Sequence, residues 1–200
     1  MARPVNGGNT QKRILDVAER LVQTRGFNAF SYADIAAALH VTKASLHYHF
    51  ATKAELGLRL IERYEREFVA ALEAIDRLGL DDREKLRRYV DIYAGVLRAN
   101  RMCLCGMLAA EFATLPKPLR TSLRGFFDAN ESWLVEVLNH GRGAGMLQFD
   151  GPAAGVAQFF VAALEGAMMM ARSYGDARRF EVGAARLLGD LADPRAPTAP

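Results

Sequence analysis

The sequence is poor in cysteine, with two among 200 residues, Cys103 and Cys105. Two cysteines cannot form a disulfide framework. Because they are two positions apart in a predicted helix, their side chains diverge and are not expected to bond to each other. The N-terminus has no apolar signal core, so a cytoplasmic protein is expected.

Aromatic residues are also scarce, at 9%, and no stretch of alternating β-branched residues predicts a strand. No internal repeat has a solenoid period. Half of the residues are hydrophobic, with abundant Ala, Leu and Met, which favours helices around a sizeable core. The sequence therefore predicts an all-α fold of one compact unit or two small ones.

Catalytic motifs are absent as well. The sequence has no phosphate-binding glycine loop, no G-x-S-x-G and no His, Cys and Asp spacing typical of a metal site. His47 and His49 are two apart on a predicted helix and point in different directions, so they would not share a metal. We therefore predict no catalytic residue, no metal and no cofactor.

Acidic residues are missing from a long stretch, 35–54, and this stretch carries the strongest pattern. Ser31 followed by Asp34 predicts a capping box at the start of a short helix. Leu39-His40-Val41 predicts a turn, and Thr42 caps a second short helix. The arrangement predicts a helix-turn-helix whose second helix enters a DNA major groove. The alternative is an ordinary helical hairpin with a polar face, which would more usually carry Glu.

The residues 41–50, VTKASLHYHF, followed by TKAEL at 52–56, resemble the signature of TetR-family transcriptional regulators. That signature usually runs V-S-K-G-T-L-Y-x-H-F and then S-K-x-E-L. This chain departs from it at His40, Ala44 and His47, where Gly, Gly and Tyr are common. Together, the polar surface of the second helix and the resemblance predict DNA contacts by Thr42, Lys43, Ser45, His47, Tyr48, His49 and Lys53. In this family the N-terminal arm, here with Arg3, can also touch the minor groove.

Charge is unevenly distributed along the chain. The net charge is +3, of which residues 1–60 contribute +4 and the rest −1. A basic excess next to the predicted helix-turn-helix suits a module that binds a polyanion. We predict a DNA-binding domain at 1–56 and a helical effector-binding and dimerisation domain at 57–200. A long helix from Thr52 to about Leu78 connects them.

The residues 152–171 are apolar enough to resemble a membrane span. Gln158 and Glu165 interrupt them, so a buried helix at a subunit interface is the favoured interpretation, and no membrane association is predicted. The last two predicted helices are apolar on more than one face, which predicts a homodimer. The resemblance implies a four-helix bundle of these helices and their symmetry mates, with a palindromic operator as partner.

Apolar and aromatic side chains of the predicted body are candidates for an effector pocket, although most would serve equally well as core. Glu111 and Glu165 are the only acids in strongly apolar stretches, and a paired or interface role is favoured for each. The predicted effector-site residues are Phe68, Tyr89, Tyr93, Cys103, Met107, Phe112, Phe127, Trp133, Phe160, Glu165 and Met168.

The sequence Cys103-Leu104-Cys105-Gly106 is similar to a Cys-Leu-x-Gly motif with which some TetR-like regulators sense oxidants or electrophiles. A packing role for these cysteines is favoured over sensing. The resulting hypothesis is a ligand-responsive homodimeric DNA-binding regulator, a repressor by resemblance, with an unidentified small-molecule effector. The alternative is a small helical enzyme or a carrier of apolar ligands, which would need a nucleophile or an acid/base pair in its interior.

Overall fold

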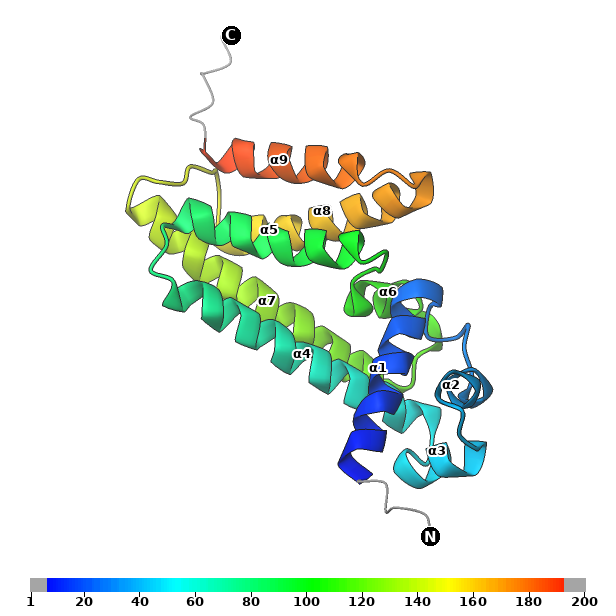
Figure 1. Cartoon of the computed structure of the whole chain (residues 1–200). Coiled ribbons are helices and arrows are strands. Elements are labelled where there is room, and N and C mark those ends of the chain that lie inside the picture. The colour runs from blue at the N-terminus through cyan, green and yellow to red at the C-terminus, as the bar shows by residue number, and fades with distance from the viewer. Residues whose placement is uncertain (1–6, 193–200) are drawn as a thin grey trace. The chain divides into compact units, whose positions relative to one another are not determined.

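The computed structural model describes residues 7–192, which form helices and no strand (Figure 1). The predicted all-α fold is confirmed. The part of the sequence that includes Arg3 and the proline-rich end from Pro194 lies outside the described residues. The helices are α1 (Gly7–Arg25), α2 (Tyr32–Leu39), α3 (Lys43–His49), α4 (Lys53–Arg77), α5 (Asp82–Arg98), α6 (Leu104–Ala110), the short 3-10 helix η1 (Phe112–Thr114), α7 (Lys117–Gly143), α8 (Ala153–Tyr174) and α9 (Arg178–Ala192).

The described residues divide into two compact units. The head unit comprises 7–66 and 101–126, and the body unit comprises 67–100 and 127–192. Each unit is therefore built from two separate stretches of chain; two of the three boundaries fall within α4 and α7, and the third falls between α5 and α6. The predicted functional boundary after residue 56 stays a prediction.

The head unit contains the predicted helix-turn-helix, with α1 packed against α2 and against α6 (Figure 1). Its core consists of apolar side chains that recur at helical spacing on one face of each helix. This core includes Ile14, Ala18, Val22, Phe27, Ile35, Leu46, Leu56 and Leu60, each 5% exposed or less.

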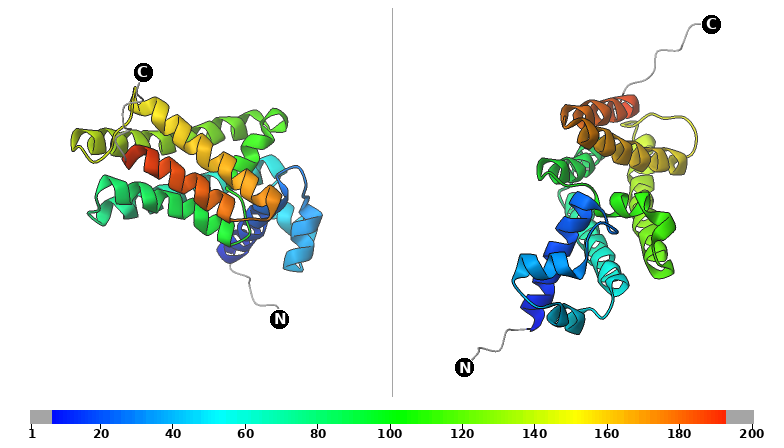
Figure 2. Two further views of the ribbon diagram at one scale, coloured as in Figure 1. Left: turned by 90° about the horizontal axis from the view of Figure 1, so that it is seen from above. Right: turned by 90° about the vertical axis from the view of Figure 1, so that its right-hand side faces the viewer.

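The body unit contains α8 and α9 side by side, with α5 packed against both (Figure 2). The glycines at 141, 143 and 145 predict a helix end near Asn139, but α7 continues to Gly143. A Cβ on Gly141 would lie 2.5 Å from Leu147 Cδ1, so this glycine allows Leu147, in the segment after α7, to pack closely against the helix. The left-handed φ of +71° at Gly145 follows the helix end, as glycine allows.

The apolar residues 102–115, which end before Pro116, predict one short helix, but the structure has α6 followed by η1. Asn9 or Thr10 is the predicted cap of the first helix, but α1 begins earlier, at Gly7. These differences concern helix ends, where the local sequence signal is weakest.

Candidate nucleic-acid interface and effector region

The ends of α2 and the start of α3 are formed by residues that the sequence predicted. Ser31 Oγ accepts from the backbone N–H of Ala33 at 3.2 Å, and Asp34 Oδ2 accepts from the backbone N–H of Ser31 at 2.7 Å. His40 ends α2 with a φ of 54°, in the left-handed region that His tolerates better than most residues. Thr42 Oγ1 accepts from the backbone N–H of Ser45 at 3.2 Å and caps α3. The helix-turn-helix is therefore fixed by three local caps.

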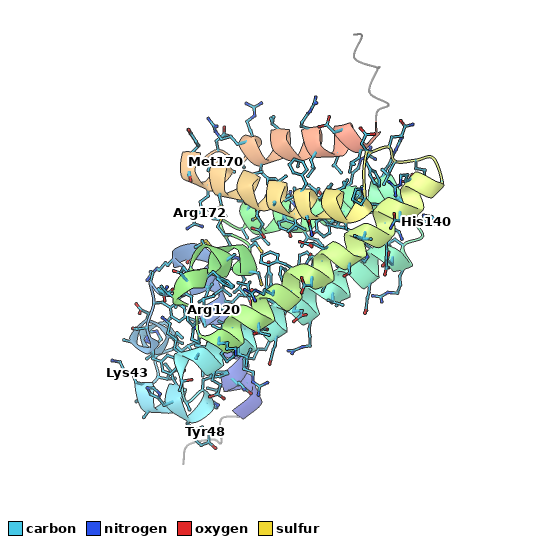
Figure 3. All side chains as sticks on the ribbon, turned by 180° about the vertical axis from the view of Figure 1, so that it is seen from behind. Lys43, Tyr48, Arg120, His140, Met170 and Arg172 are labelled. Carbon is cyan, nitrogen blue, oxygen red and sulfur yellow. The ribbon has the colours of Figure 1, made fainter. Side chains whose placement is uncertain are left out.

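One face of α3 is buried and the other is open. Leu46 is 1% exposed and anchors the helix in the head unit, whereas Tyr48 is 87% exposed. Lys43 and Tyr48 project away from the ribbon of α3 (Figure 3). Of the other predicted contacts on this segment, Thr42 and His47 are exposed, and Ser45 and His49 are half-buried. The open face therefore carries hydrogen-bonding side chains and no carboxylate.

The ring of His47 is held in place from two sides. Its Nδ1 lies 3.1 Å from the backbone oxygen of Ala51, and its ring centroid lies 4.7 Å from that of Tyr32 on α2. Tyr32 is fixed in turn, because its hydroxyl donates to the backbone oxygen of Phe50 at 2.9 Å. Burial and the negative charge of Glu55 raise the pKa of Tyr32 to about 12, so Tyr32 stays neutral at physiological pH.

Lys53 lies at the first position of α4, but its amine is half-buried. It donates to the backbone oxygen of Phe30 and lies 4.8 Å from the ring centroid of Phe27 and 4.3 Å from that of Phe30. Burial lowers its pKa, although the opposite charges of Glu111 and Asp34 act in the other direction. The amine thus has partners within the head unit, and its predicted DNA contact stays a prediction.

Glu111, at the end of α6, binds the turn that follows α1. Its carboxylate accepts from the backbone N–H of Phe27 at 2.7 Å and from that of Asn28 at 3.1 Å. Asn28 Nδ2 also donates to Thr114 Oγ1 at 2.7 Å. Gly26 has a φ of +97°, and a Cβ there would lie 2.6 Å from Glu111 Oε1. The favoured interpretation of Glu111 as a paired carboxylate fits this geometry.

The two cysteines are buried and not bonded to each other. Cys103 is the N-cap of α6, where its Sγ accepts from the backbone N–H of Gly106 at 3.4 Å. The hydroxyl of Tyr64 donates to the same Sγ at 3.8 Å. These contacts suit a packed thiol at a helix junction.

Tyr89 on α5 is the centre of an aromatic cluster in the body unit. The hydroxyls of Tyr89 and Tyr93 are 3.2 Å apart, and Tyr89 also donates to Asn130 Oδ1 at 3.0 Å. The ring of Trp133 stacks on that of Tyr89 with their centroids 5.6 Å apart. The rings of Phe160 and Tyr89 meet edge to face, with their centroids 5.9 Å apart. Phe68 completes this cluster, with its ring centroid 5.9 Å from that of Tyr89.

The predicted effector-site residues fall into both units. Cys103, Met107 and Phe112 belong to the head unit, and the other eight belong to the body unit. The structure brings five of these eight together around Tyr89. Phe127 on α7 is half-buried, Met168 on α8 is fully buried, and the carboxylate oxygens of Glu165 on α8 are buried.

A cavity of about 550 Å³ lies elsewhere in the body unit, beside the beginning of α8 and the end of α9. None of the predicted effector-site residues lines it. Sequence reasoning did not identify this cavity, because its walls combine a connecting segment and the start of α8 with the end of α9, which is distant from both in sequence. Its lining is Gln148, Phe149, Asp150, Pro152, Gly155, Val156, Phe159, Leu187, Asp190 and Leu191.

The helices α8 and α9 also expose large apolar side chains. Phe159 is 65% exposed, Met170 50% and Val182 70%, and Met170 is marked on α8 in Figure 3. Only 33% of the most apolar window of α8 is buried within the chain. This helix is long and apolar enough to cross a membrane, but a single such helix is weak evidence of a span.

Acidic, cysteine and histidine side chains do not gather into a metal-binding group of three anywhere in residues 7–192. His140, which lies outside the helix-turn-helix, is paired with a carboxylate, because its Nδ1 lies 2.7 Å from Asp82 Oδ2.

Comparisons with known proteins cover most of the chain. Residues 14–60 match the model of bacterial regulatory proteins of the tetR family, and residues 83–187 match the tetracyclin repressor-like C-terminal domain. A TetR-family transcriptional regulator from Agrobacterium tumefaciens is similar in structure, with a TM-score of 0.91 and 32% identity, over 94% of this chain and 100% of that one.

Two curated regulators are similar in sequence. The transcriptional regulator AcuR from Cereibacter sphaeroides is 28% identical over 74% of this chain and 69% of its own length. The HTH-type transcriptional repressor DhaR from Mycobacterium sp. is 23% identical over 80% of each chain.

Proposed function

The chain belongs to the tetR family of bacterial regulatory proteins, and from this premise we propose that it is a repressor released from a palindromic operator by a small molecule. It is a DNA-binding transcriptional regulator. The observation that carries the proposal is the open face of α3, where Lys43 and Tyr48 project from a capped helix without a carboxylate. Such a helix can enter a major groove without repelling phosphate.

A mobility-shift assay on the DNA upstream of the protein's own gene tests this proposal. Specific binding should survive an excess of random duplex and weaken steeply as salt rises, since each neutralised phosphate releases counterions. Binding that is equal for the upstream DNA and for random duplex would contradict a sequence-specific regulator.

We propose that two copies of the chain form a homodimer through α8 and α9. Phe159, Met170 and Val182 are large apolar side chains exposed in the single chain, and burial of each would contribute about 1.5–3 kcal/mol. The apolar character of α8 also suits an interface in a soluble protein, which agrees with the expected cytoplasmic location. A dimer would present two copies of α3 to two half-sites.

The effector site that we propose lies in the body unit, around the Tyr89 cluster. Aromatic walls with a few polar groups are typical of small-molecule sites. Here, the hydroxyls of Tyr89 and Tyr93 and the amide of Asn130 supply those groups. A thermal-shift screen of the substrates of enzymes encoded by neighbouring genes tests this site. The variant Tyr93→Phe should keep the fold but bind the effector more weakly.

Thiol modification is a second effector route, suggested by Cys103 at the start of α6. The test is operator release after mild alkylation or peroxide, in the wild type and in Cys103→Ser and Cys105→Ser. Mass spectrometry verifies that both thiols are modified. If the modified protein keeps full operator affinity, this route is excluded.

Catalysis is not part of the proposed function. The relatives with curated names are transcriptional regulators, and an enzyme would need a nucleophile or acid/base pair inside the body. The cavity of about 550 Å³ is a candidate space for an apolar ligand, and a carrier would hold such a ligand without responding through DNA affinity. Operator release by the ligand therefore separates a regulator from a carrier.

A further inference from the structure

We propose that His47 makes operator affinity depend on pH, because only its charged imidazolium can donate a hydrogen bond from Nε2 to DNA. The inference rests on the DNA-binding role of α3 and adds a proton to the binding reaction. It follows from the two contacts that hold the imidazole ring.

The contact at Nδ1 determines which nitrogen carries hydrogen. A backbone oxygen can only accept, so the 3.1 Å contact with the carbonyl of Ala51 requires hydrogen on Nδ1. Neutral His47 then has its lone pair on Nε2 and can only accept there. Phosphate oxygens and the major-groove edge of guanine are acceptors too. A proton must therefore be added before Nε2 can bind any of them.

His47 lies on the face of α3 that carries Lys43. His47 is exposed and follows Lys43 by four residues, so both side chains lie on one face of α3. Lys43 projects outward from that face (Figure 3). Tyr32 covers one side of the ring, with centroids 4.7 Å apart. The ring thus has little freedom to turn, and its orientation is set before DNA binds.

Charged and titratable groups surround the ring. Lys43 lies on the same face of α3. The carboxylate of Glu55 accepts from the backbone N–H of Ala51 at 3.0 Å. Tyr32 contributes no charge. His49, Tyr48 and Lys53 complete the neighbourhood, with the amine of Lys53 engaged by the backbone oxygen of Phe30.

Proton uptake on binding gives a signed prediction. Uptake of one whole proton per protomer lowers the dissociation constant by up to about tenfold per protomer for each unit by which the pH falls. Histidine is the side chain that ordinarily changes charge between pH 5 and 8. Operator binding by the wild type should therefore tighten from pH 8 to pH 6, by about tenfold or more over the two units.

The experiment measures dissociation constants from pH 6 to pH 8 at constant salt. The probe is a duplex that the wild type selects from a random library at pH 7. His47→Gln keeps an amide donor that does not titrate, and His47→Tyr provides a neutral hydroxyl, so both should bind with much less pH dependence. His40→Asn is the matched control and should keep the wild-type slope, because His40 is an exposed histidine of the turn at a left-handed φ that Asn also tolerates.

Three results would overturn the proposal: a wild-type affinity independent of pH, an affinity that weakens toward pH 6, or an unchanged slope in both His47 variants. Weakening toward acid would mean that neutral Nε2 accepts from a base amino group. Failure of this inference is distinct from failure of the proposed function, because selection of a specific duplex at pH 7 tests DNA recognition independently.

Discussion

Both the head unit and the body unit have an apolar core and polar bonds between their elements, and they differ in what is added to these. In the head unit, single polar side chains bond to distant backbone groups, as Glu111 does to Phe27 and Asn28, and Lys53 does to Phe30. In the body unit, aromatic rings surround Tyr89, and much of the surface of α8 and α9 stays apolar and exposed.

This difference matches what each unit has to do. Hydrogen bonds are directional, so the head unit fixes the orientation of α3. Apolar contacts are not directional, and a core of aromatic side chains together with Met168 can repack around a ligand. The exposed apolar surface of α8 and α9 additionally suits a second copy of the chain.

The largest effect is expected from a charge placed on the apolar surface of the body unit. Phe159→Glu and Leu188→Glu should give monomers, because a buried unpaired carboxylate is costly. Loss of the second half-site should then weaken operator binding about 100-fold or more. Light scattering and a shift assay measure the two effects. Val69→Glu, which alters an exposed side chain of α4, is the control and should remain dimeric. A dimer that persists in both variants would place the interface elsewhere.

The next effect concerns the DNA-binding face of the head unit. Lys43→Ala should weaken operator binding by about 1–3 kcal/mol if Lys43 binds a base edge. Lys12→Ala is a matched control, because Lys12 is an exposed lysine of the same unit that pairs with Asp16 at 3.1 Å. Titration of a labelled operator measures both. Unchanged affinity for Lys43→Ala together with Tyr48→Phe would contradict the assigned orientation of α3.

Substitution of one glycine in each unit compares how tightly the two units pack around a left-handed residue. Gly26 in the head unit and Gly79 in the body unit both have positive φ, at +97° and +64°. An added Cβ meets Glu111 at 2.6 Å in the first case and nothing within 4 Å in the second. Gly79→Ala should therefore cost only the left-handed strain of about 1–2 kcal/mol, and Gly26→Ala should cost more. Urea unfolding measures both costs, and equal costs would contradict the tight contact with Glu111.

Much of the head unit could be predicted from sequence, since its signals are local. Ser31, Asp34 and Thr42 lie within a few residues of the backbone groups that they cap, and these caps are confirmed. Glu111 lies 83 residues from Asn28, and no local pattern reveals that pairing. The contacts of Lys53 could not be predicted for the same reason. Its place in the family signature does not indicate that its amine lies over the rings of Phe27 and Phe30.

The body unit was predicted less completely, because apolar residues look alike whether they line a core, a cavity or an interface. The sequence predicted Tyr89, Tyr93 and Phe160 as candidates for a pocket or for plain core, and all three are at most 2% exposed. It did not predict that they share one cluster. The ends of α7 also differ from prediction, because Gly141 is needed for contact with Leu147 and does not end the helix.

The smallest expected effect is the pH dependence of an ion pair in the body unit. Burial raises the pKa of Asp76, but hydrogen bonds from Lys85 and Trp133 and the charge of Lys85 hold it below the ordinary value of 3.8. Since the folded pKa is depressed, this stabilisation is present above pH 3.8 and is lost as the pH falls through the folded value. Asp76→Asn should therefore reduce the acid sensitivity of unfolding slightly. Asp16→Asn in the head unit, where the pKa is also lowered, is the companion variant. An identical acid profile in wild type and Asp76→Asn would contradict this assignment.

The central claim is that two copies of α3, joined through α8 and α9, recognise DNA in a sequence-specific way. Selection of bound duplexes from a random library tests it most directly. The account predicts enrichment of a palindrome whose half-site centres are roughly 34–36 Å apart, or a multiple of that spacing, and loss of this enrichment in Lys43→Ala. Enrichment of no sequence, or of a single half-site without symmetry, would contradict it.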